Sequence, residues 1–200
     1  FLALAVNTAG VLAAMLGWFA GATILILAAS AVAAFALRVF RPSVKAPKTT
    51  GIHPTFPIFV RFAYAWMLVA AALGVCAVFR DQGGGLWGSS RHALTVGMMS
   101  SMVFAIGQRV LPAFCGMRVL FSPRLMFWSL ALLNTGCLLR VSSEIGAYES
   151  YVPAMWPLLP VSAIIEMTAV TLFALSLLLT FRQPHCQMVE LLPATFMLMP

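Results

Sequence analysis

The sequence is short of charge, and of acidic residues above all. Only 8% of its 200 residues are charged, and five of them are Asp or Glu. At 62% hydrophobic residues and a mean hydropathy of +0.99, the chain has more apolar surface than a water-soluble fold of this length could bury. We therefore predict that its solvent is lipid.

Several motifs of enzyme chemistry are also absent. The sequence has no HExxH zinc motif, no glycine-rich phosphate loop and no pair of carboxylates spaced for acid–base catalysis. Its four cysteines show neither CxxC nor Cys/His metal spacing, so we interpret them as packing residues: Cys76, Cys115, Cys137 and Cys186. The alternating pattern of membrane barrel strands is missing too, which leaves helices as the spanning elements.

Long apolar runs predict an all-α integral membrane bundle of five transmembrane helices within residues 1–184. We expect these helices at residues 6–39, 58–79, 92–111, 125–140 and 158–181. Gly17 and Gly21 form a GxxxG pair in the first run, which we interpret as a surface for close helix packing. Residues 185–200 are expected to form a short cytoplasmic tail.

The net charge of +7 comes from basic residues at the ends of apolar runs, which indicates membrane orientation and no nucleic-acid partner. If the five helices alternate in direction, nine Lys and Arg residues fall on one side of the membrane and three on the other. The side with nine is predicted to be cytoplasmic. This arrangement places the N-terminus outside and the C-terminus inside.

Two ionisable residues stand out within the apolar runs. His92 opens the third run, beside Arg91 and on the same predicted side as Arg140. Its imidazole is either an axial haem ligand, with the two arginines near the haem propionates, or an interfacial side chain bonded to backbone or water. Glu166 lies about 12 Å from the start of the last helix by helical rise, where an acid is costly unless it is paired or functional.

Residues 92–97 read His-Ala-Leu-Thr-Val-Gly and are followed by a methionine-bearing helix and Arg109. This pattern is similar to the signature of the NnrS family of bacterial haem-copper membrane proteins linked to nitric oxide metabolism. The resemblance covers about residues 58–182. Weaker matches occur there in the same order as in the family: Tyr64 with Trp66, Gly116, Leu139 with Arg140, and Ala169 with Phe173.

This resemblance implies a multi-pass protein of the bacterial inner membrane that binds haem b through His92. The sequence also departs from the family, because Arg61 and Phe114 stand where the family motifs carry histidine. The family has about a dozen spanning helices, and this chain resembles its C-terminal portion. We therefore do not expect copper to be bound within this chain alone.

Two hypotheses of function follow. The first is a haem-binding membrane protein of nitric oxide or respiratory metabolism. The second is a non-catalytic transmembrane subunit that packs against other membrane subunits of a larger complex through its small-residue surfaces. A small transporter that uses Glu166 as its proton or ion site is a third alternative, although the sequence shows no inverted repeat.

Overall fold

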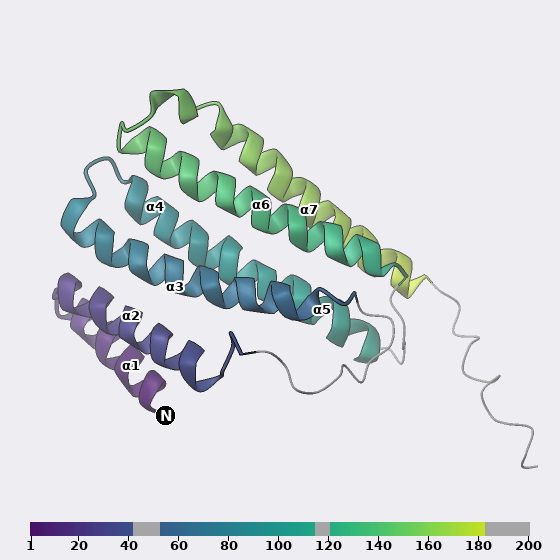
Figure 1. Cartoon of the computed structure of the whole chain (residues 1–200), viewed down its shortest axis with the longest axis horizontal. Helices are drawn as coiled ribbons and strands as arrows, with labels where there is room; N and C mark the ends of the chain where they lie inside the picture. The colour runs from purple at the N-terminus through teal and green to yellow at the C-terminus, as the bar shows by residue number, and fades with distance from the viewer. Residues whose placement is uncertain (42–52, 115–120, 183–200) are drawn as a thin grey trace, which may run out of the picture.

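A bundle of roughly parallel and antiparallel helices makes up the described part of the chain (Figure 1). The computed structural model describes residues 1–41, 53–114 and 121–182, without the side chains of residues 109 and 112–114. Within these ranges there is no strand, and the predicted all-α class is confirmed. The α-helices are α1 (Leu2–Met15), α2 (Phe19–Ala36), α3 (Phe56–Arg80), α4 (Gly85–His92), α5 (Ser101–Phe114), α6 (Pro123–Tyr148) and α7 (Leu158–Phe181). A π-helix, η1 (Ala93–Ser100), joins α4 to α5, and a 3₁₀ turn, η2 (Pro153–Met155), precedes α7.

The helices have the length and composition of membrane spans. In the described ranges, four segments are long and apolar enough to cross a bilayer: α2, α3, α6 and the stretch Pro153–Phe181 that contains α7. Helix α1 is apolar but shorter, and α4, η1 and α5 follow one another without interruption from Gly85 to Phe114. Large apolar side chains point outward on several of these helices, Leu12, Ile164 and Met167 among them. Such surfaces suit contact with lipid chains.

The first apolar run is two helices, although the sequence predicted a single helix over residues 6–39. Gly17, with φ of +81°, ends α1 in the left-handed conformation. The N–H of Gly17 donates to the carbonyl of Ala14, and the N–H of Trp18 donates to that of Ala13. These two bonds form a Schellman cap that satisfies the last carbonyls of α1. Because both sides of the turn are equally apolar, hydropathy alone could not detect it.

The predicted packing role of the Gly17–Gly21 pair is also revised. Gly17 serves the turn, and the ring of Trp18 covers Gly21 so closely that no Cβ could be added there. The close approach of α1 to α2 occurs at Gly10, where an added Cβ would lie 3.0 Å from Ile26 and 3.1 Å from the Ala22 carbonyl.

Helix α6 is longer than predicted, since it continues from Arg140 to Tyr148. The added turns lie partly against other helices. Ser143 is fully buried, and Ser89 of α4 donates its hydroxyl to the carbonyl of Val141. Helix α7 begins and ends as predicted, whereas the third predicted helix starts earlier, at Gly85. The predicted tail at residues 185–200 lies outside the described residues.

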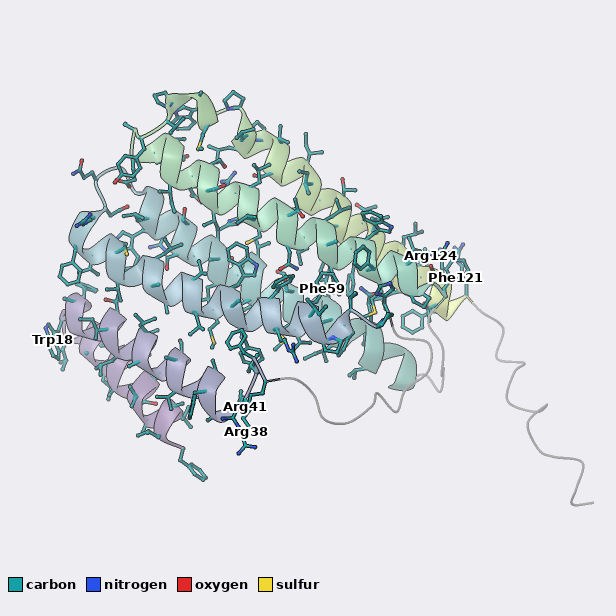
Figure 2. All side chains as sticks on the ribbon, viewed as in Figure 1. Trp18, Arg38, Arg41, Phe59, Phe121 and Arg124 are labelled. Atoms are coloured by element: carbon teal, nitrogen blue, oxygen red, sulfur yellow. The ribbon has the colours of Figure 1, made fainter. Side chains whose placement is uncertain are left out.

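Several of the described arginines lie at one end of the bundle. Arg38, Arg41 and Arg124 lie toward the same end, and Trp18 marks the opposite one (Figure 2). Because α1 and α2 form a hairpin, the N-terminal residue also lies at the arginine-bearing end (Figure 1). The turns after α1, α3 and α6 share the other end, which we call the turn end.

The core between the helices consists of two apolar clusters. The first gathers around Phe104, Met126, Leu130 and Leu133, and the rings of Phe104 and Phe173 stack there with centroids 4.1 Å apart. The second lies nearer the turn end and consists of Trp66, Ala70, Ala93, Cys137 and Val141. This second cluster packs α3 and η1 against α6, close to the ionisable residues described in the next subsection.

A carboxylate clamps the turn end. Glu149, just beyond α6, accepts the backbone N–H groups of Gln82 and Gly85 at 3.1 Å each, and that of Gly83 at 3.3 Å. Partial burial acts to raise the pKa of Glu149, but these N–H groups, together with the Asp81 side chain, hold that pKa below its usual range. The clamp fixes the α3–α4 turn to the end of α6.

The clamp should weaken in acid. A group whose pKa is lowered on folding stabilises the fold above its unfolded pKa, which is 4.5 for a free glutamate, and loses that effect as the pH falls through the lower folded value. We expect wild-type thermal stability in detergent to fall below about pH 4.5, and the stability of Glu149→Gln to fall less over the same range. A variant as acid-sensitive as the wild type would contradict this account.

Candidate functional site

The two ionisable residues that the sequence marked separately lie in contact. Nε2 of His92, at the end of α4, is 3.1 Å from Oε1 and 3.3 Å from Oε2 of Glu166 on α7. Their side chains are 25% and 16% exposed. The pair therefore lies at the edge of the bundle, partly shielded by its helices, and joins segments 74 residues apart in sequence.

Two further charged side chains extend this pair from α6. Arg140 and Glu144 are one helical turn apart, with Nε 3.9 Å from Oε2. Glu144 also lies within electrostatic reach of His92 and Glu166. Nε of Arg140 and Oε2 of Glu144 are buried and have no hydrogen-bond partner among the described residues. We call His92, Arg140, Glu144 and Glu166 the polar cluster.

Three members of the polar cluster, His92, Arg140 and Glu166, share a similar depth. His92 is seven residues beyond the start of α4, Glu166 is eight beyond the start of α7, and Arg140 is eight before the end of α6. At about 1.5 Å per residue, these three lie roughly 11–12 Å from the turn end. The cluster is therefore within the apolar part of the bundle, where unpaired charges are costly.

A glycine allows the close approach that brings Glu166 into the cluster. A Cβ added at Gly136 of α6 would lie 2.7 Å from Cγ of Glu166 and 3.3 Å from its backbone nitrogen. Only a residue without a side chain leaves room for α7 at this point. The position of the carboxylate thus depends on the backbone contact between α6 and α7.

An eight-residue π-helix follows His92 directly. The wider π turn rotates the side chains after His92 relative to those of a continuous α-helix. Within it, the hydroxyl of Ser100 donates to the carbonyl of Thr95, and the Cys137 thiol lies 4.0 Å from the carbonyl of His92. π-helical segments are frequent at functional sites, which makes this an independent indication for the region around His92.

The arginines predicted to accompany His92 lie in different places. Arg140 is in the polar cluster, while Arg91 is exposed and lines a cavity formed with α1 and α2. Arg61, where the resembled family carries a histidine, donates to the carbonyl of Arg41. The side chains of Arg109 and Phe114 are outside the described part of the structure, as are Gly116, Cys115 and Cys186.

In the described structure, both oxygens of Glu166 face Nε2 of His92, so this nitrogen is in contact with a carboxylate. Two apolar cavities stand out in the structure, one of about 610 Å³ between α3 and α6 and one of about 480 Å³ beside Arg91, and His92 lines neither. In the described residues, no group of three or more His, Cys, Asp or Glu side chains could hold a metal ion.

Sequence reasoning marked three members of the cluster and missed the fourth. Glu144 was not among the predicted site residues, although its spacing of four from Arg140 is the spacing of a helical ion pair. That spacing was the available signal. The contact between His92 and Glu166 has no comparable sequence signal, because it depends on how α4 and α7 are placed around α6.

The fold and the cluster define an all-α membrane-type bundle with an ionisable site inside its apolar region. The family model of a domain of unknown function, DUF8744, matches residues 1–182, and the chain belongs to this family. Comparisons with curated proteins and with solved structures found no match.

Gly136 provides a test of the packing that places Glu166. We expect Gly136→Ala to lower the stability of the bundle in detergent by about 1–3 kcal/mol, the usual cost of overpacking a tight contact. Gly107→Ala is the matched control, because its Cβ would meet Phe173 at an ordinary 3.5 Å. Equal thermal denaturation midpoints for the two variants would show that Gly136 is not the required close contact.

Proposed function

We propose that this chain is a multi-pass membrane protein whose polar cluster binds and releases a proton. The observation that carries the proposal is the contact of His92 with Glu166 within a cluster that also contains Arg140 and Glu144. An imidazole and a carboxylate can each accept a proton, and in contact they can share one.

The charge balance of the cluster supports this function. Two carboxylates and one guanidinium leave one negative charge in excess when all three are ionised and the imidazole is neutral. Excess charge is costly in a partly buried, apolar setting. One added proton, on His92 or on a carboxylate, makes the cluster neutral, so the site is suited to hold a proton and to release it when a partner or a conformational change supplies compensating charge.

The other charged groups near the cluster do not change this balance. Arg91 of α4 points to a different face, and Arg80 stands at the end of α3. Asp81 accepts the N–H of Leu86, and Glu149 is held by the turn it clamps. Proton exchange would take place from the turn end, about 12 Å away by helical rise.

The hairpin of α1 and α2 changes the proposed orientation. The sequence predicted one helix over residues 6–39, and that helix placed the N-terminus outside. In the structure, the α1–α2 hairpin returns the first residue to the arginine-bearing end. By the positive-inside rule, we propose that both described termini face the cytoplasm of a bacterial inner membrane and that the turn end faces outward. The polar cluster would then lie nearer the outer surface.

Infrared spectroscopy of the chain in lipid tests the proton site. We expect the difference spectrum between samples at low and high pH to contain carboxyl and imidazole bands. Glu166→Gln and Glu144→Gln should each reduce these bands, because the loss of either carboxylate leaves the cluster neutral with no added proton, and His92→Gln should remove the imidazole bands. Thr168→Val, on the outward face of α7, is the matched control. An unchanged spectrum in Glu166→Gln would reject the proposal.

Haem binding through His92 is the second candidate function, with a role in nitric oxide or respiratory metabolism as the NnrS resemblance implies. A specific observation favours it: His92 shares the polar cluster with Arg140, a cation that could pair with a haem propionate. Arg140 lies at a suitable depth for a propionate. For Nε2 to meet an iron, however, His92 would first have to leave Glu166.

A reduced-minus-oxidised optical spectrum distinguishes the candidates. If His92 ligates haem, the purified chain shows a haem band that His92→Ala abolishes, and Glu166→Gln keeps it because Nε2 is then released. A chain that shows the pH-dependent infrared bands without a haem band supports the proton site alone. A chain with neither signal would favour the remaining alternative, a non-catalytic subunit that packs within a larger membrane complex.

A further inference from the structure

A groove beside Arg91 is a second feature of the turn end. It has a volume of about 480 Å³, within the range of natural ligand sites, and lies where α4 approaches the α1–α2 hairpin. Its apolar lining comes from the hairpin, and α4 supplies Trp87 and Arg91; the lining residues are Ala14, Phe19, Ala22, Thr23, Ile26, Trp87 and Arg91. The surface of the groove is thus almost wholly apolar, and Arg91 is the one charged residue among those that line it.

Arg91 is a cation in an unusual position. It is exposed, and it lies six residues into the helix that starts at Gly85, about 9 Å from the turn end by helical rise. Arginines at helix ends can reach water directly, but one at this depth must extend toward the interface or meet an anion. Trp87 precedes it by four residues, so both side chains lie on the same face of α4.

The described part of the protein offers Arg91 no carboxylate. Its four acids are each engaged elsewhere: Asp81 with the N–H of Leu86, Glu149 with the α3–α4 turn, Glu144 beside Arg140, and Glu166 beside His92. An anion that balances Arg91 would have to come from outside these residues. Arginine binds phosphate groups well because its planar guanidinium can donate two parallel hydrogen bonds.

We propose that this groove binds an anionic phospholipid, with its phosphate on Arg91 and an acyl chain against the α1–α2 hairpin. Charge complementarity identifies the headgroup, since the groove carries one cation and its other lining side chains are uncharged. Ala22 and Ile26 form an apolar wall of the groove, which suits contact with the acyl chain of the lipid. Trp87, with an apolar ring and one N–H donor, suits the boundary between the two parts of the lipid. The bound lipid fills the space between the hairpin and α4 and so joins α1 and α2 to the rest of the bundle at the turn end.

Native mass spectrometry of the full chain, released from bilayers that contain phosphatidylglycerol and phosphatidylcholine, tests this site. We expect the wild type to retain phosphatidylglycerol preferentially, and Arg91→Gln to lower that retention about fivefold, the effect expected for one basic residue at a membrane surface. Arg80→Gln removes an exposed cation at the same end of the bundle and should leave retention unchanged. An equal loss in both variants would show a general charge effect and would overturn the proposal, as would full retention in Arg91→Gln.

Two further arms separate the headgroup from the acyl chain. Ala14→Leu places additional carbon atoms in the groove and should reduce the retention of phosphatidylglycerol while leaving Arg91 in place. Inorganic phosphate, added to the lipid-free chain in detergent, should raise the thermal midpoint less than phosphatidylglycerol does, because it makes no apolar contact. If phosphate alone gives the same Arg91-dependent stabilisation, or if Ala14→Leu retains lipid like the wild type, the groove is not a lipid site.

Discussion

A charge in the apolar interior of a membrane has to be balanced by something close to it, because no water is present to do so. The transfer of an isolated ion into such a setting costs several kcal/mol even after the surroundings relax. In this bundle, that constraint explains the arrangement of α4, α6 and α7 at the turn end. Each of these helices contributes at least one member of the polar cluster at nearly the same depth. The cluster can exist only if the three helices stay in register, and Gly136 allows the approach that brings Glu166 to His92.

Two arginines of this region meet the same constraint in different ways. Arg140 points toward Glu144 and shares the cluster with a second carboxylate and an imidazole. Arg91 is adjacent in sequence to His92, yet it faces another direction, because consecutive residues of a helix are separated by about 100° around its axis. With the described acids engaged, its balancing charge has to come from elsewhere. Helix α4 thus carries His92 of the polar cluster and, on another face, Arg91 at a surface that suits contact with lipid.

The sequence was sufficient for the fold class, because hydropathy is a local property and lipid leaves helices as the main solution for an apolar chain without barrel patterning. It was insufficient wherever the outcome depended on a contact between distant segments. The Gly17 turn lies between two apolar stretches, so composition does not change across it. The continuation of α6 past Arg140 depends on the burial of Ser143 by other helices. The His92–Glu166 pair spans 74 residues, and no periodicity in either helix could predict which face of α7 would meet α4.

The proton site and the haem site proposed for this chain depend on one atom, Nε2 of His92. A nitrogen lone pair can hold a proton or a metal, and ligation requires the deprotonated form. In the described arrangement that nitrogen faces Glu166, and the cluster is neutral when it holds one proton. Removing His92 from Glu166 would leave two carboxylates with a single guanidinium between them, at a depth where excess negative charge is unfavourable. A cation bound at His92 could restore the balance, so the two functions would compete for the same site rather than operate together. The proposed haem ligation and the observed contact of His92 with Glu166 would therefore be alternative states of one imidazole, and the acidic residues around it would determine which state costs less.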